Sequence, residues 1–401
     1  MRAPREASQR AAIPPAIWVL GGVSLLMDVS SEMIHSLLPL FMVTSLGASA
    51  LAVGLIEGLA ESTALIVKVF SGVLSDYWGK RKSLALFGYA MSALTKPLFA
   101  LSSSLSLVLT ARLLDRVGKG VRGAPRDALV ADIAPPAIRG AAFGLRQALD
   151  TVGAFLGPLF AVGLMLLWQD RFRAVFWVAL LPGAAAVVLL TLGMSEPDRA
   201  ETAVKTGNPI RRDNLRQLSA AYWQVVTVGA IFTLARFSEA FLVLRAQQTG
   251  VAIAFVPLIM VAMNIVYALS AYPFGKWSDR MNPYSLLALG LLALFGADLL
   301  LATAHRWPQV LAGVTLWGIH LGITQGLLAA MVAATAPATL RGTAFGVFNL
   351  ISGGAMLLAS LFAGFLWDRY GASYTFFTGA VFCLVTLTTL AWNRQNVVNR
   401  H

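Results

Sequence analysis

Long apolar runs recur along the whole chain, and they constrain its fold more than any other feature. Each run has roughly 20 residues, the length that an α-helix needs to cross the hydrocarbon core of a bilayer. Inside lipid only helices and closed barrels satisfy their backbone polar groups, and continuous runs rich in Leu, Ala and Gly are helical. The sequence therefore predicts an all-α integral membrane protein. Its twelve predicted spans lie near residues 16–40, 50–75, 82–102, 106–131, 138–166, 173–194, 219–246, 253–276, 284–303, 308–334, 341–366 and 373–392.

Composition supports this class and excludes several others. The chain is 57% hydrophobic and 12% charged, with a mean hydropathy of +0.71, whereas a soluble chain carries about twice that share of charge. Its one cysteine, Cys383, excludes a disulfide framework within the chain, and its four histidines lack metal-ligand spacing. The sequence contains no nucleotide-binding loop of the form G-x-x-x-x-G-K-[ST]. We therefore expect no enzyme, no metal site, no cofactor and no ATP-driven pump.

Basic residues in the short loops predict the orientation. Both tails, residues 76–82 and the loop near 195–218 are rich in Lys and Arg, whereas the alternate loops carry no charge. Positively charged loops stay on the cytoplasmic side, so both termini should be cytoplasmic, in a bacterial inner membrane. The net charge of +12 is accounted for by this topology and by contact with anionic lipid headgroups. We expect a monomer in the bilayer with no nucleic-acid partner.

The chain contains an internal duplication. "VADIAPPAIRGAAFG" (130–144) matches "VAATAPATLRGTAFG" (332–346), and "GVLSD" (72–76) matches "GKWSD" (275–279). Matches in the same order at an offset of about 200 residues indicate a repeated unit of six spans. We predict an N-terminal six-helix bundle at 1–194, a cytoplasmic linker at 195–218 and a C-terminal six-helix bundle at 219–401.

The loop after the second span carries a specific resemblance. "GVLSDYWGKRK" (72–82) is similar to the signature G-x-L-[SA]-D-x-x-G-[RK]-[RK]-[RK] of the major facilitator superfamily, and matches it at Gly72, Asp76, Gly79, Lys80 and Arg81. The likeness covers nearly the whole chain, and the run "DRVGKGVRGAPRDAL" resembles a prokaryotic exporter subgroup of that superfamily. It implies two six-helix bundles around a central cavity that opens alternately to each side.

A second motif resembles one found in exporters that exchange drugs for protons. "GAFLGP" in the fifth span matches the antiporter motif G-x-x-x-G-P at Gly153, Gly157 and Pro158. The paired glycines that usually follow are absent, and the glycine spacing is also typical of close helix packing.

The fourth span carries a stripe of cations. At 100° per residue, five basic side chains fall within about 120° of arc on one helix face. They are Arg112, Arg116, Lys119, Arg122 and Arg126. Asp28 and Glu32 share one face of the first span. Ions at membrane depth are costly, so they face a bundle interior or water.

These faces supply the candidate site. For the proton and substrate cavity we predict Asp28, Glu32, Arg112, Arg116, Arg122, Arg146, Asp150, Arg236 and Glu239. For the cytoplasmic gate we predict Gly72, Asp76, Gly79, Lys80, Arg81, Arg126, Asp132 and Arg341.

The roles of these charges stay open at this point. The cations either compensate the carboxylates, hold an anionic substrate group, or do both, and the alternative is that the ion pairs only tie helices together. Arg116 and Arg122 are expected within reach of Glu32 or Asp28. His35 fits a packing residue, and Glu57 and Glu61 fit side chains that meet water near the end of their span.

The function predicted from these features is secondary active transport of a small organic, anionic solute by alternating access, with proton-coupled export. Uptake on the same fold and a non-transporting membrane receptor or assembly protein are the alternatives. A receptor should carry a large soluble signalling domain, and the sequence contains none.

Overall fold

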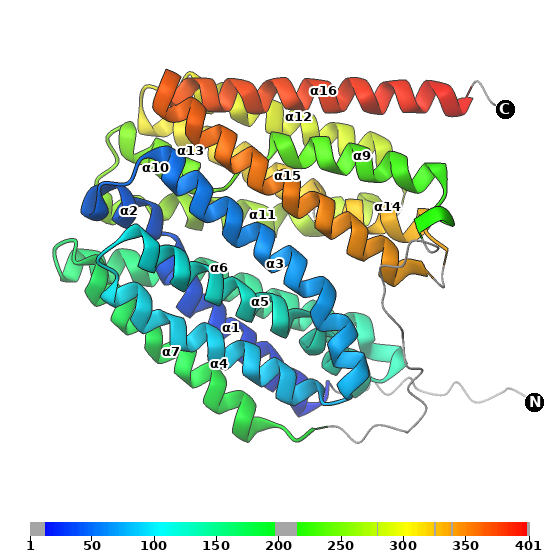
Figure 1. The fold of residues 1–401 in the computed structure, drawn as a ribbon, viewed down its shortest axis with the longest axis horizontal. Helices are drawn as coiled ribbons and strands as arrows, with labels where there is room; N and C mark the ends of the chain where they lie inside the picture. The colour runs from blue at the N-terminus through cyan, green and yellow to red at the C-terminus, as the bar shows by residue number, and fades with distance from the viewer. Residues whose placement is uncertain (1–12, 197–214, 279, 325, 338–339, 399–401) are drawn as a thin grey trace, which may run out of the picture.

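The computed structural model describes residues 13–196, 215–278, 280–324, 326–337 and 340–398, without the side chains at 73, 76, 137, 278 and 393–398. Within these residues every regular element is a helix and none is a strand (Figure 1). In chain order the elements are α1 (Pro15–His35), α2 (Leu38–Leu46), α3 (Ala50–Trp78), α4 (Arg81–Leu101), α5 (Leu105–Ile133), η1 (Pro136–Ile138), α6 (Arg139–Leu167), α7 (Phe172–Gly193), α9 (Ala220–Ala235), α10 (Ala240–Gln248), η2 (Ile253–Phe255), α11 (Leu258–Ser278), α12 (Pro283–Ala302), α13 (Trp307–Thr324), α14 (Leu327–Thr335), α15 (Arg341–Tyr370) and α16 (Ala372–Val398).

The all-α membrane fold predicted from the sequence is confirmed. Eleven segments of the described chain are long and apolar enough to cross a membrane. The helix missing from that set is α5, which has 29 residues and is therefore about 43 Å long at 1.5 Å per residue. Helix α5 is long enough to cross a membrane, but it is not apolar enough to belong to that set because it carries the basic stripe. Counting α5 gives the twelve expected spans.

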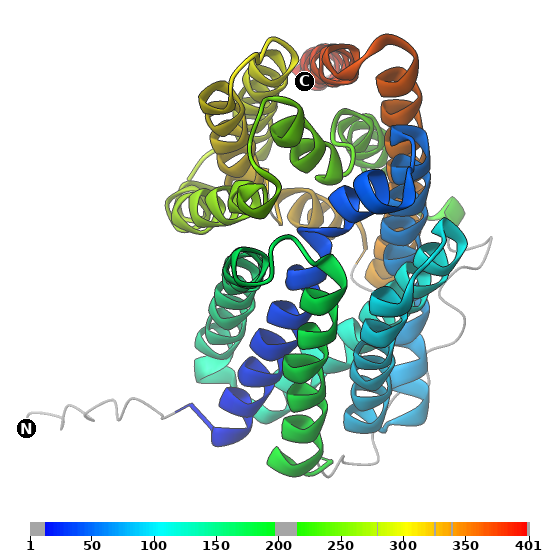
Figure 2. The same cartoon turned by 90° about the vertical axis from the view of Figure 1, so that its left-hand side faces the viewer.

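The helices form two groups. In the N-terminal group (α1–α7), α1 packs on α6 and α7, and α4 packs on α5 and α7. In the C-terminal group (α9–α16), α12 packs on α13 and α16, and α9 packs on α15 and α16. Figures 1 and 2 show the two groups side by side, with α3 against α15 at their contact. Most of the linker lies outside the described residues, so the boundaries at 194 and 219 stay a prediction.

Three of the predicted spans are each divided into two helices, which the apolar pattern did not reveal. The first span consists of α1 and α2, the seventh consists of α9 and α10 with a non-helical stretch at 236–239, and the tenth consists of α13 and α14. The short segments α2 and α10 contact each other at the end opposite that where α1 begins and α16 ends (Figure 1). We call this opposite end the distal end and the other the terminal end.

The distal end is also where α3 and α15 are locked together. The Asp368 carboxylate near the end of α15 accepts hydrogen bonds from the backbone N–H groups of Ala50 (2.9 Å) and Leu51 (2.8 Å), the first residues of α3. Gly54 lies so close to Ser360 that a Cβ there would sit 2.2 Å from its carbonyl oxygen. These contacts hold the two groups together across the distal half of the molecule.

Candidate functional site

A charged cavity lies between the two groups of helices. Its distal chamber has a volume of about 270 Å³ and is lined by residues of α1, α2, α3, α5, α10, α11 and α15 and by the break between α9 and α10. A second chamber of about 460 Å³, which we call the terminal chamber, adjoins it toward the terminal end. The chambers share five lining residues, which are Glu32, Glu61, Lys119, Arg236 and Glu239. The site therefore draws its side chains from both halves of the duplication.

The distal part of the basic stripe is paired with carboxylates of α3. Arg112 Nη2 lies 2.5 Å from Glu57 Oε2, and Arg116 Nη2 lies 2.9 Å from Glu61 Oε1. These partners correct two expectations, because Arg116 meets Glu61 rather than Glu32 or Asp28, and Glu57 is buried in an ion pair rather than meeting water. Pairing of this kind compensates cations that would otherwise be costly in the membrane.

Arg122 turns away from Glu32 and toward α4. Its guanidinium donates a hydrogen bond to the Ser92 hydroxyl and lies 4.9 Å from the centre of the Tyr89 ring. Helices α4 and α5 approach closely here, since a Cβ at Gly88 would be 2.8 Å from the backbone nitrogen of Arg122. Although Arg122 borders the terminal chamber, its polar contacts tie α5 to α4.

Four charged residues join α5 to α6 beside the terminal chamber. Arg146 Nη1 lies 2.5 Å from Asp150 Oδ2, and Arg126 lies 3.2 Å from Asp127 and 3.9 Å from Asp150. Arg126 also donates a hydrogen bond to Ser24 of α1 at 3.2 Å. The predicted cavity residues Arg146 and Asp150 and the predicted gate residue Arg126 thus belong to one network.

A buried chain of polar groups leads from the cavity into the N-terminal group, and the sequence did not predict it. Lys96 Nζ of α4 donates to Asp115 Oδ1 at 3.1 Å, and Asp115 Oδ2 lies 3.4 Å from His35 Nε2. His35 Nδ1 in turn lies 3.5 Å from Glu32 Oε1 at the cavity wall.

Two signals could have found this chain. A lysine in the middle of an apolar span requires a counter-ion, and Asp115 falls near −60° on the wheel that places Arg112 at 0°. It therefore lies within the arc of the basic stripe.

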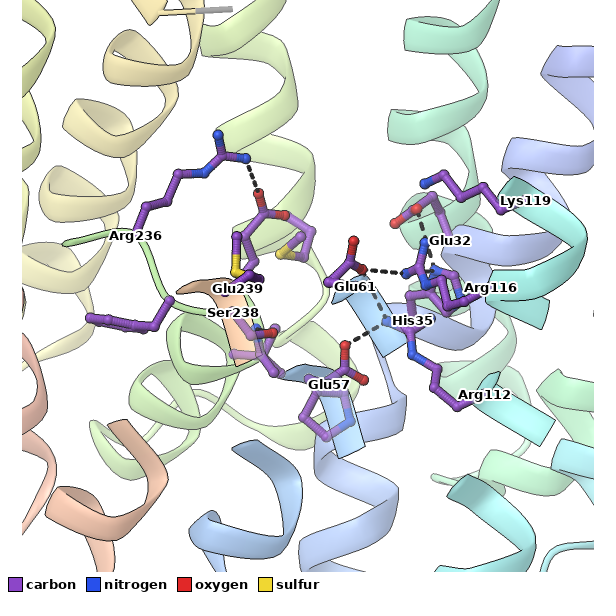
Figure 3. Close-up of a pocket in the computed structure, with 16 residues that line it drawn as sticks. Glu32, His35, Glu57, Glu61, Arg112, Arg116, Lys119, Arg236, Ser238 and Glu239 are labelled. Carbon is purple, nitrogen blue, oxygen red and sulfur yellow. Dashed lines mark hydrogen bonds and ion pairs between the residues drawn. The ribbon is translucent and has the colours of Figure 1, made fainter. Parts of the chain in front are cut away.

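The C-terminal group contributes one loose ion pair at the break between α9 and α10. Arg236 Nη2 lies 3.9 Å from Glu239 Oε1, and both side chains are about one-third exposed. Figure 3 shows this pair on one side of the cavity and Lys119, Glu32 and Arg116 on the other. The Lys119 side chain is exposed to the cavity and makes no ion pair with any described residue.

The comparisons with known proteins agree with this geometry. The sequence matches the family model of the Major Facilitator Superfamily over residues 20–245 and over residues 228–397. The chain belongs to the Major Facilitator Superfamily. It is 32% identical to an uncharacterized MFS-type transporter of Methanocaldococcus jannaschii, over 92% of both chains. It is 24% identical to the inner membrane transport protein YajR of Escherichia coli, over 95% of this chain and 83% of YajR. The human organic anion transporter MFSD10 shares the fold, with a TM-score of 0.68 at 18% identity over 94% of this chain and 100% of that one.

The superfamily's loop signature ends α3 and begins α4. Gly79 has a φ of +68° and closes α3, which explains why the signature needs glycine there. The Arg81 guanidinium forms an ion pair with Asp132 and donates to the Ala128 carbonyl oxygen at 3.3 Å. The side chain of Asp76 lies outside the described residues, so its predicted part in the cytoplasmic gate stays a prediction.

The antiporter-like motif packs α6 against the acidic face of α1. A Cβ at Gly153 would lie 2.6 Å from the Leu25 carbonyl oxygen, and one at Gly157 would lie 2.7 Å from the Glu32 Cβ. Pro158 is buried within α6. The absence of side chains at both glycines lets the two helices touch, and this contact fixes the position of Glu32 at the cavity.

Proposed function

We propose that this superfamily member is a secondary active transporter that moves a small organic anion across the inner membrane by alternating access, coupled to protons, as a monomer with cytoplasmic termini. The name of YajR, an inner membrane transport protein, supports the location. The name of MFSD10, an organic anion transporter, supports the class of solute.

The observation that carries the proposal is a pair of cations that face one cavity from opposite halves. Lys119 of α5 has no ion-pair partner among the described residues, and Arg236 holds Glu239 only at 3.9 Å. Arg112 and Arg116 each already pair one guanidinium nitrogen with a carboxylate, that of Glu57 and that of Glu61. A carboxylate or phosphate group of a solute would therefore bind between Lys119 and Arg236 and join the two halves.

Charge balance supports coupling to protons. The distal chamber has four cationic and four carboxylate side chains in its wall, so an added anion makes the chamber negative unless a group in the wall takes up a proton. Among the described residues, Glu32 pairs with His35 and not with an arginine, Glu239 lies 3.9 Å from Arg236, and Asp28 of the terminal chamber forms no ion pair. Among the carboxylates, these three are the ones that proton uptake would leave with the fewest broken ion pairs.

Two directions of transport follow from two different observations. Export is the first proposal, because residues 153–158 resemble the antiporter motif. Uptake is the second, because an anion and a proton that neutralise each other bind together, and an inward proton gradient would then drive both inward. Closure of the distal end by α2, α10 and Asp368 supports a state in which the cavity is reached from the terminal end.

The test is binding and exchange by the full chain in nanodiscs and liposomes, with short mono- and dicarboxylates and organic phosphates as probes. Lys119→Gln and Arg236→Gln should each weaken anion binding about 10- to 100-fold, the effect of one hydrogen bond to a charged group. Arg306→Gln, at an exposed arginine before α13, is the matched control and should bind like the wild type. Equal anion binding by all three variants would exclude this site.

Proton movement then decides the direction. Acidification of the liposome lumen together with anion entry supports uptake, and alkalinisation with anion entry supports exchange. Anion movement without proton movement would exclude proton coupling.

A further inference from the structure

His35 lies between a donor and an acceptor that compete for one ring nitrogen. Its Nδ1 atom is 3.5 Å from Glu32 Oε1, which can only accept a hydrogen bond when ionised, and 3.5 Å from Arg116 Nη2, which can only donate. If Nδ1 carries a proton, it can donate a hydrogen bond to Glu32. If Nδ1 carries a lone pair, it can accept a hydrogen bond from Arg116. Nδ1 can therefore satisfy only one of these partners at a time.

The other ring nitrogen faces a carboxylate. His35 Nε2 lies 3.4 Å from Asp115 Oδ2, whose second oxygen accepts from Lys96 Nζ at 3.1 Å. Lys96 also donates to the Ser31 hydroxyl at 3.1 Å, and its side chain is fully buried. A carboxylate fixed in this way is an acceptor, so it selects the form of His35 that carries hydrogen on Nε2.

We propose that His35 is a proton-binding site of the transport cycle and exchanges Glu32 for Arg116 as its partner when it loses a proton; this deepens the proposed function and rests on it. A proton from cavity water binds the Nδ1 lone pair, and the imidazolium then donates from Nδ1 to Glu32 and from Nε2 to Asp115. When Nδ1 returns the proton to water, it accepts from Arg116, and Glu32 is free. No bond other than this N–H forms or breaks.

The surroundings set what this exchange does to the cavity. The charged groups that face His35 are Glu32 on α1, Glu57 and Glu61 on α3, Lys96 on α4, Arg112, Asp115, Arg116 and Lys119 on α5, and Arg236 and Glu239 across the chamber. Proton uptake adds one positive charge and engages Glu32, so Lys119 is less compensated and attracts an anion more strongly. Asp115 and Lys96 act as positioning residues, because they reach the cavity only through His35.

The first test reads the imidazole nitrogens directly. In full-length protein with ¹⁵N-labelled histidine in nanodiscs, the ¹⁵N chemical shifts should show His35 changing from doubly protonated at low pH to the Nε2–H tautomer at high pH. His35→Gln identifies its signals; if that variant does not fold, the signals that persist in single variants of His305, His320 and His401 identify them. A His35 signal that stays in one form from pH 5 to 8.5, or a neutral form with hydrogen on Nδ1, overturns the proposal.

The second test links the proton to the anion. Wild-type affinity for the short carboxylates should increase about tenfold when His35 gains its proton, the size of effect expected for one added charge in the same chamber in a medium of intermediate dielectric constant. His35→Gln should lose this pH dependence, and His305→Gln, at an exposed histidine, should keep it. Asp115→Asn should change the tautomer of the neutral form, which a purely structural role would not do.

The two proposals fail in different ways. If the wild type binds no anion at any pH, the transport proposal fails. If it binds and exchanges anions but His35→Gln keeps the wild-type pH dependence, only the assignment of His35 fails.

Discussion

Replacing Asp368 with asparagine should loosen the distal contact between the two halves. The carboxylate accepts the N–H groups of Ala50 and Leu51 at 2.9 and 2.8 Å, and these groups form the positive end of the α3 dipole. Asparagine keeps one acceptor oxygen and loses the charge and one hydrogen bond. Because Asp368 is exposed to solvent, the loss should be about 1 kcal/mol, which increases the population with an open distal end about fivefold.

The assay is labelling of a cavity cysteine from the distal side. On a Cys383→Ser background, Met356→Cys places a thiol in the wall of the distal chamber, and a membrane-impermeant maleimide reports how often that chamber opens. Asp368→Asn should raise the labelling rate about fivefold, the population change expected for about 1 kcal/mol. Asp170→Asn, at an exposed aspartate in the loop after α6, is the control and should leave the rate unchanged. A rate equal to wild type in Asp368→Asn would refute the reasoning.

Three further predictions concern stability and packing. Gly157→Ala should destabilise the fold by about 1–3 kcal/mol because its Cβ would overlap α1, whereas Gly163→Ala on the same helix, with open space at its Cβ, should melt like the wild type. Lys96→Met should cost about 3–5 kcal/mol because it leaves Asp115 buried without its cation, and adding Asp115→Leu should restore most of the melting temperature. Arg122→Ala should lower the melting temperature because it removes the contacts of Arg122 with α4, yet it should change anion affinity less than about twofold. A large loss of affinity at unchanged stability would show instead that Arg122 binds the substrate.

Local features of the sequence were enough to predict the class of fold and the faces that carry charge. The length of each apolar run predicts the spans, and helical periodicity predicts the stripe from Arg112 to Arg126. Both properties depend on residues within a few turns of one another, so a single sequence contains them. The loop signature at 72–82 added the family in the same local way.

Which charge meets which was decided only by the tertiary structure. A helical wheel gives the direction of Arg116 and Arg122 from their own helix axis, but it does not identify the helix that lies opposite. Because α3 packs beside α5, Glu61 rather than Glu32 reaches Arg116. Because α4 approaches α5 at Gly88, Arg122 finds Ser92.

The breaks between α1 and α2 and between α9 and α10 have the same origin. Each lies within a stretch that the sequence predicts as one span. The chain bends at both breaks, and the short segments that follow them, α2 and α10, pack on each other. His35 shows the same dependence on packing, since its sequence neighbours suit a packing residue, whereas the structure places it beside Asp115 and Arg116 of another helix. The sequence determined which groups enter the membrane, and the packing of distant helices determined their partners, because ion pairs and hydrogen bonds form over about 3 Å in space and not along the chain.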